Sequence, residues 1–183
     1  MKDELLAAIP ELREIENEIL RDQCVSAFLD VMHIAGRTPA ELAEMPFTLL
    51  ISPCSVSFVD HTRRVTRTAL AIAEVLADNW QGEDAMEFDR DILLATALLH
   101  DVGKILEYER EPGGNWRKSE CGKLLRHPVS GAGICMKWGL PDRVVHGVMY
   151  HSHEGDGNRA TLEAVIVNHA DFLNFEPLKL KYG

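Results

Sequence analysis

An apolar run lies between Ile92 and Leu99, where Thr96 is the single polar residue. Its richness in alanine and leucine favours a buried helix over a strand. The run leads directly into His100 and Asp101. An imidazole or a carboxylate is costly to bury without a partner, so a segment that carries both into the interior must supply one. A bound metal cation is the simplest partner.

Apolar residues at helical spacing also occur on both sides of this run. Thr38 and Pro39 are typical of an N-cap followed by the first residue of a helix, here a short one that ends near Glu44. Residues 47–60 contain Pro53 and β-branched residues, which indicates an extended connector. Longer helices are predicted over residues 11–35, 58–79, 92–108, 127–138, 141–151 and 161–175.

The segments between these helices contain no convincing pair of strands. An acidic loop occupies residues 81–91, and a turn-rich loop follows residue 110. We therefore predict an all-α fold of six or seven helices. The chain has 183 residues and is 46% hydrophobic, which is enough for one domain with a substantial core. We expect residues 1–57 to form N-terminal helices and a connector, and residues 58–175 to form a metal-binding helical core.

Charge and cysteine usage narrow the functional classes. A net charge of -10 argues against a surface for duplex nucleic acid, which is held mainly by clustered lysine and arginine. The four cysteines are scattered without a CxxC pair, which argues against a zinc ribbon and against a disulfide framework. We infer a reducing compartment. No signal peptide or membrane-spanning run is found. We expect a cytoplasmic protein without membrane contact, and its oligomeric state is left open.

Polar groups at inward-facing or helix-terminal positions form a candidate metal site. Nitrogen and oxygen ligands of this kind suit one or two divalent ions, with Fe, Mn, Zn, Ni, Co and Mg all possible. Three further histidines, His33, His146 and His169, fall on other faces and are interpreted as hydrogen-bonded core residues. The candidate ligands are His61, His100, Asp101, His127, His151 and Asp171.

The order H…HD…H…H…D over residues 58–175 resembles the HD superfamily of metal-dependent phosphohydrolases. The family's minimal motif corresponds to His61, to His100 with Asp101, and to Asp171. The resemblance implies an HD-domain helical bundle, in agreement with the predicted helices. In binuclear members the aspartate of the HD pair bridges two metals, and His127 and His151 look like the additional ligands of the second ion.

Several subfamilies share parts of this pattern. The HDVGK and RHPVSGA segments are similar to the HD-GYP cyclic-dinucleotide phosphodiesterases, but Ser152 stands where that family has a paired histidine. The connector, the His61 helix and the GKLLRHP segment look like the HD domain of bacterial three-prime exoribonucleases. The order of the six ligands is also similar to that in bacterial diadenosine tetraphosphate hydrolases. The subfamily therefore stays open at this point.

The resemblance implies hydrolysis of a phosphoester in a small, nucleotide-derived substrate by metal-activated water. Uncatalysed phosphate-ester hydrolysis needs accelerations that approach ~10²¹, whereas a positioned acid or base contributes about 10²–10⁴, so metal ions are required. Phosphatase and phosphodiesterase activities would share this chemistry. The alternative is a non-catalytic nucleotide-sensing or regulatory domain, although degenerate members usually lose ligands.

Other residues have candidate roles around this chemistry. Gly103 leaves room for close backbone approach, and Lys104 shares a helix side with Asp101, where its ammonium could neutralise a phosphate. The alternative is that Lys104 extends into solvent, but its spacing from Asp101 favours the phosphate role. His153 is a candidate for the acid that protonates the leaving group, or for a further metal ligand. Arg64 or Arg126 is a candidate ligand of the substrate.

Overall fold

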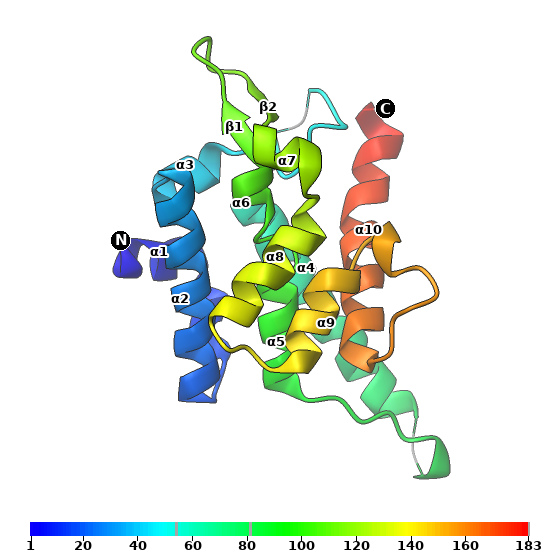
Figure 1. Ribbon diagram of the computed structural model, residues 1–183. Coiled ribbons are helices and arrows are strands. Elements are labelled where there is room, and N and C mark those ends of the chain that lie inside the picture. Colours follow the sequence, from blue (N-terminus) through cyan, green and yellow to red (C-terminus); the bar gives the residue numbers. More distant parts are fainter. Residues whose placement is uncertain (54, 81, 183) are drawn as a thin grey trace.

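Helix α5 (Arg90–Leu99) lies at the centre of a bundle of helices in this computed structural model, which describes residues 1–53, 55–80 and 82–182 (Figure 1). The all-α prediction is confirmed. Long helices surround α5, and shorter helices and one hairpin connect them. The helices are α1 (Lys2–Ala8), α2 (Glu18–Ala35), α3 (Pro39–Glu44), α4 (Phe58–Asn79), α6 (Lys104–Glu107), α7 (Glu120–Leu124), α8 (His127–Lys137), α9 (Asp142–Tyr150) and α10 (Leu162–Tyr182), with 3-10 turns at Pro10–Glu14, Gly82–Asp84 and His153–Gly155.

Helix α5 is buried on both faces, as its apolar run predicts. Leu94 and Leu98 belong to a large cluster that also includes residues of α1, α2, α8 and α9. Leu93 and Ala97 belong to a second cluster with residues of α4 and α10. The N-terminal helices thus pack into the same hydrophobic core as the helices that carry the HD pattern. Among the described residues, no helix is both long and apolar enough to cross a membrane.

Local sequence signals account for several helix starts. The predicted cap at Thr38 is confirmed, because its side chain and that of Glu41 form a capping box at the start of α3. Ser57 and Asp60 form an equivalent box at the start of α4. Asp89 caps α5, and its side chain accepts hydrogen bonds from the backbone N–H groups of Asp91 and Ile92.

The first part of the chain differs from the prediction. Helix α1 is missed, and the helix expected over residues 11–35 is split into a 3-10 turn and α2. The Asp91 carboxylate accepts hydrogen bonds from the backbone N–H groups of Glu16 and Asn17, and Asn17 then caps α2. A contact from a distant helix therefore fixes the break. Ile19, in the first turn of α2, is 73% exposed.

The helix expected over residues 92–108 is also interrupted. Residues 100–103 form a tight turn in which N–H groups bond carbonyls three residues earlier, including Lys104 to Asp101 at 2.8 Å. An antiparallel hairpin, β1 (Tyr108–Arg110) and β2 (Trp116–Lys118), replaces the loop expected after residue 110. Its strands have three residues each, too few for periodicity to be seen in the sequence.

Helix α10 continues to Tyr182, seven residues beyond the predicted end, with Pro177 inside it. Val75 of α4 and Leu173 of α10 are apolar residues on exposed helix faces, 59% and 60% exposed. The connector closes on itself, because the N–H of Phe47 donates to the carbonyl of Val56. Residues Cys54 of the connector and Gln81 of the acidic loop lie outside the described residues.

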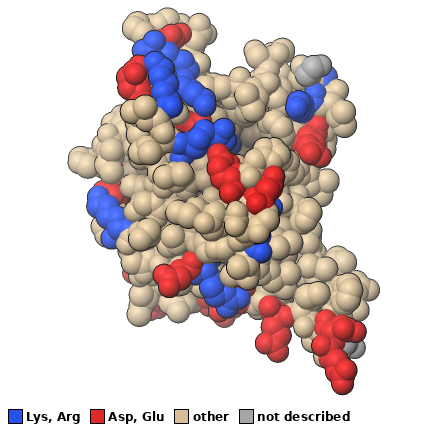
Figure 2. Space-filling view, turned by 45° about the vertical axis from the view of Figure 1, so that its right-hand side comes forward, with Lys and Arg blue, Asp and Glu red and all other residues tan. Residues whose placement is uncertain are grey.

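Charge is unevenly spread over the surface. In Figure 2, Lys and Arg side chains gather toward the end that carries the hairpin, and Asp and Glu side chains occupy the projecting corner at the lower right. The hairpin contributes the exposed cations Arg110, Arg117 and Lys118. These cations pair with glutamates, so the hairpin end carries charges of both signs.

Candidate metal centre

The six predicted ligands come together from five places in the bundle. Five of the six belong to two groups that share Asp101, and all members of both groups are buried. The first group contains His61 of α4, His100 and Asp101, and the second contains Asp101, His127 at the start of α8 and His151 after α9. Within each group the candidate ligand atoms lie within 4.8 Å of one another.

Asp101 lies between the two groups and turns one oxygen toward each. Its Oδ2 atom is 3.5 Å from Nε2 of His61 and 3.3 Å from Nε2 of His100. Its Oδ1 atom is 3.3 Å from Nε2 of His127 and 3.6 Å from Nε2 of His151. A carboxylate in this position can bridge two cations.

Asp171, from α10, completes the first group. Its Oδ1 atom lies 3.0 Å from Nε2 of His61 and 4.0 Å from Nε2 of His100. Its side chain is 15% exposed, so it reaches the group from the solvent side. The structure thus brings together residues that lie 110 positions apart in the sequence.

Backbone carbonyls hold two of the histidine rings in place. Nδ1 of His100 lies 2.7 Å from the carbonyl of Ala97, and Nδ1 of His151 lies 2.8 Å from the carbonyl of Val148. A carbonyl can only accept, so Nδ1 carries the proton in both rings. Each Nε2 atom then has a lone pair that faces Asp101.

Four buried atoms at the centre have no hydrogen-bond partner among the described residues. They are Nε2 of His61, His100 and His151 and Oδ1 of Asp101. Lone pairs that face one another in a buried site repel unless a cation or proton lies between them. Imidazole nitrogen and carboxylate oxygen are ligands for divalent transition metals. The residues present therefore fit a divalent metal centre.

The pKa directions of His61, His127 and Asp101 agree with this assignment, whereas that of His100 favours the protonated ring. Burial lowers the pKa of His61, and it lowers the pKa of His127 to about 4, so both rings are neutral at pH 7. Burial alone would lower the pKa of His100, but the Asp101 carboxylate outweighs it and raises that pKa. Burial opposes ionisation of Asp101, yet the charges of Lys104 and His100 hold its pKa well below the usual value. Neutral imidazoles and ionised carboxylates are the forms that bind metals.

Lys104 lies on the same side as Asp101, as predicted. Its Nζ atom donates to Oδ2 of Asp101 at 2.6 Å and to the carbonyl of Phe47 at 2.8 Å. The Phe47 ring lies 4.5 Å from the His61 ring, measured between centroids. Lys104 thus ties the connector to the shared carboxylate. Gly103 allows the expected close approach, since a Cβ atom there would lie 2.2 Å from the His127 carbonyl oxygen.

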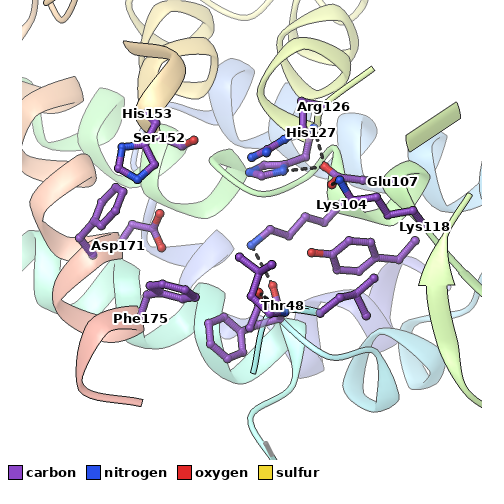
Figure 3. A pocket seen from close by; sticks show the side chains of 15 residues that line it. Thr48, Lys104, Glu107, Lys118, Arg126, His127, Ser152, His153, Asp171 and Phe175 are labelled. Atoms are coloured by element: carbon purple, nitrogen blue, oxygen red, sulfur yellow. Dashed lines mark hydrogen bonds and ion pairs between the residues drawn. The ribbon is translucent and has the colours of Figure 1, made fainter. Parts of the chain in front are cut away.

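A cavity of about 170 Å³ opens beside the metal centre (Figure 3). Asp171 and His127, one ligand from each group, line it together with Lys104. In Figure 3, His153 and Phe175 lie on the Asp171 side, and a charged side chain group lies on the His127 side. That group consists of Glu107, Lys118 and Arg126.

The weaker candidates have mixed outcomes. Arg126 lines the cavity, 3.5 Å from Glu154, and His153 lines it with a side chain that is 79% exposed. Arg64 was the wrong choice, because it lines a different hollow on the outer side of α4. Among the histidines assigned to the core, His146 accepts a hydrogen bond from the N–H of Ala160, whereas His33 and His169 are exposed.

Sequence reasoning missed Glu107, which is buried beside His127. Its Oε2 atom lies 2.7 Å from Nδ1 of His127 and 2.7 Å from the His127 backbone nitrogen. Burial alone would raise the pKa of Glu107, but these hydrogen bonds outweigh it and lower the pKa to about 2. In the sequence Glu107 is one acidic residue near a predicted helix end, and no local pattern separates it from a solvated one.

Comparison with known proteins identifies the family. The profile of the HD domain matches residues 58–174. The chain belongs to the HD domain family. The matched segment begins in the first residue of α4 and ends in α10, so it contains all six candidate ligands.

Individual relatives match over part of their length. The chain is 33% identical over 116 residues to a dihydroneopterin 2',3'-cyclic phosphate phosphodiesterase from Methanocaldococcus jannaschii, covering 62% of this chain and 44% of that protein. It is 32% identical over 92 residues to ribonuclease Y from Desulforamulus reducens, covering 49% of this chain and 15% of the enzyme. For ribonuclease Y from Geotalea uraniireducens the identity is 36% over 77 residues, or 42% and 12% of the two chains. The chain thus spans less than half of these relatives, and no solved structure matches it.

Proposed function

We propose that this chain hydrolyses a phosphoester bond in a small, nucleotide-derived substrate with the help of one or two divalent metal ions. The observation that carries the proposal is the position of Asp101, whose two oxygens face two groups of buried histidine nitrogens beside an open cavity. The names of the relatives, a cyclic phosphate phosphodiesterase and two ribonucleases, support a phosphodiester substrate.

His61, His100, Asp101 and Asp171 would hold the first ion. Asp101, His127 and His151 would hold the second, so that Asp101 serves both. When bound, such ions lower the pKa of water and polarise a phosphoryl oxygen, which is the chemistry that this reaction needs. The identity of the metal among Fe, Mn, Zn, Ni, Co and Mg is left to elemental analysis.

The chain's own residues orient the substrate. Lys104 directs a buried positive charge toward the cavity beside Asp101, where it offsets phosphate charge. Arg126 adds a second cation on the His127 side, and His153 offers an imidazole to the leaving group from the opposite side. Phe172 and Phe175 line the cavity near Asp171 and offer apolar surface to a planar ring.

We also propose a single domain over residues 1–183 and a cytoplasmic location. The shared core of the N-terminal helices with α5, α8 and α9 supports the single domain. The free cysteines Cys24, Cys121 and Cys135 and a nucleotide-derived substrate support a reducing interior.

The test is a substrate screen of the chain loaded with Mn²⁺ or Fe²⁺. The substrates are 2',3'-cyclic nucleotides, linear dinucleotides, cyclic dinucleotides, dinucleoside polyphosphates and nucleoside monophosphates. We expect turnover of at least one phosphodiester, loss of turnover on chelation, and a decrease of more than about 100-fold in the Asp101→Asn variant. The control is Asp22→Asn, which changes an aspartate that is 67% exposed, lies 3.4 Å from Lys2 and contacts no residue of the candidate site.

The outcome also decides between the two functional classes. Absence of turnover on every phosphoester, with two ions bound per chain, would refute the enzymatic proposal and favour a nucleotide sensor. Hydrolysis of monophosphates alone would identify a phosphatase instead of a phosphodiesterase.

A further inference from the structure

The two candidate metal groups differ in negative charge. The first contains the carboxylates of Asp101 and Asp171, whereas the second contains only Asp101, which it shares. The other members of the second group are His127 and His151. The ammonium of Lys104 adds positive charge 2.6 Å from Asp101. A second divalent ion would therefore lie in a buried site with little negative charge of its own, which weakens its binding.

The groups also differ in how their rings are held. His100 and His151 each place Nδ1 against the carbonyl of the residue three positions earlier, a contact within their own helical turn. His127 is the first residue of α8, and the residues before it are extended. Its own helix therefore offers no such carbonyl, and the ring needs an acceptor from elsewhere.

Glu107 provides this acceptor from 20 residues away in the sequence. Its side chain is 3% exposed, and Oε2 receives both Nδ1–H and the backbone N–H of His127, each at 2.7 Å. With Nδ1 protonated, Nε2 of His127 has its lone pair directed at Oδ1 of Asp101, 3.3 Å away. Figure 3 shows this pair of side chains at the edge of the cavity.

The hairpin and α7 hold Glu107 in place. The carbonyl of Glu107 accepts the N–H of Ser119 at 2.8 Å, and the Ser119 hydroxyl donates to the carbonyl of Leu106 at 2.6 Å. Gly122 of α7 packs directly on Glu107, because a Cβ atom at Gly122 would lie 2.2 Å from the Glu107 carbonyl oxygen. Lys118 of β2 lies 3.5 Å from the other carboxylate oxygen. The insertion between α6 and α8 thus fixes the Glu107 backbone from one side.

We propose that Glu107 is a positioning residue for the second metal ion. It fixes the tautomer and direction of the His127 ring, and it supplies the negative charge that the second group lacks. Carboxylates that accept the distal N–H of a ligating histidine act in this way in many metal sites, where their loss costs 10–100-fold in metal affinity. The inference rests on the metal centre of the proposed function.

The test measures Mn²⁺ binding to the metal-free chain by calorimetric titration and elemental analysis, without any assay of activity. The variants are Glu107→Gln, which keeps the shape and removes the charge, and Glu107→Ala. The matched control is Glu163→Gln, because Glu163 is also buried and bonded to a cation, Arg143, but belongs to neither metal group. His127→Ala gives the reference for a chain that retains only the first site.

We expect wild type and Glu163→Gln to bind two ions. In both Glu107 variants the affinity of the second site should fall 10–100-fold, while the first site changes less than about twofold. Nitrogen NMR of the metal-free chain should show His127 protonated at Nδ1 in wild type and a mixture of tautomers in Glu107→Ala.

Second-site affinity within twofold of wild type in both Glu107 variants would overturn the inference and leave the proposed metal centre intact. Equal loss at both sites would also overturn it, because it would indicate a general structural role. A wild-type chain that binds no Mn²⁺ would overturn the metal centre itself, and the inference with it.

Discussion

Lys104 offers the sharpest test of whether cations bind at Asp101. Its Nζ atom donates to Asp101 at 2.6 Å and to the Phe47 carbonyl at 2.8 Å, and its side chain is 10% exposed. Methionine has a similar length and no charge, so Lys104→Met removes both contacts with little change in volume. After the substitution, the stability of the buried Asp101 carboxylate depends on the other positive charges at the site.

The size of the effect should depend on the metal. In the metal-free chain, loss of one partner of a buried ion pair costs about 3–5 kcal/mol of unfolding free energy. In the loaded chain the bound ions compensate Asp101, and the remaining cost is the unpaired Phe47 carbonyl, about 1–3 kcal/mol. The difference of roughly 2 kcal/mol appears, through linkage, as Mn²⁺ binding that is about 30-fold tighter in the variant.

Urea unfolding with and without saturating Mn²⁺, together with a Mn²⁺ titration, measures these quantities. We expect the variant to bind Mn²⁺ more tightly and to turn over substrate more slowly, because the phosphate loses a cation. The control is Lys123→Met, since Lys123 is 56% exposed, pairs with the exposed Glu120, and should change stability by less than about 0.5 kcal/mol in either form. Equal destabilisation with and without Mn²⁺ would refute the reasoning, because it would show that the ions do not contact Asp101.

Two further predictions concern the metal-free chain. Burial lowers the pKa of His127 to about 4, so the unfolded chain takes up its proton first as pH falls below about 6.5. The stabilisation from the neutral ring is present above that pH and is lost toward pH 4. Urea unfolding should show that His127→Gln loses up to about 3 kcal/mol less unfolding free energy than wild type across this window. Equal losses would exclude His127 as the cause. Gly103→Ala would place Cβ 2.2 Å from the His127 carbonyl oxygen and should lower the free energy of unfolding by about 3 kcal/mol or more. The control Gly133→Ala, in open space on α8, should instead stabilise the chain by about 0.5–1 kcal/mol. Thermal unfolding compares the two variants, and an unchanged stability of Gly103→Ala would show that the close packing is not needed.

The candidate metal ligands were predictable because their residue types are costly to bury. A histidine and an aspartate that follow directly after the apolar run of α5 need partners, and the order of histidines and aspartates along the chain matches the family pattern. The helices that carry them were predictable from apolar periodicity. What the sequence could not provide was the identity of the groups that hold the ligands in place.

Those supporting groups come from contacts over long separations. Glu107 reaches His127 across 20 residues, and Phe47 stacks on His61 from a connector without periodicity. Arg64 was a candidate substrate ligand, but it lines a different hollow on α4, away from the cavity. Charged residues on a helix are compatible with many environments, so only the packing of neighbouring elements separates a site residue from a solvated one.

The break between α5 and α6 explains how a single aspartate can face both metal groups. If α5 had continued as a regular helix, as the sequence predicted, its backbone would leave no turn at residues 100–103 for α8 to approach. The absence of a side chain at Gly103 lets the first turn of α8 lie against this turn, and His127 is the first residue of that helix. His127 thereby reaches one oxygen of Asp101 while His61 and His100 reach the other. The bridging geometry is therefore a consequence of the backbone at residues 100–103 as much as of the ligands themselves.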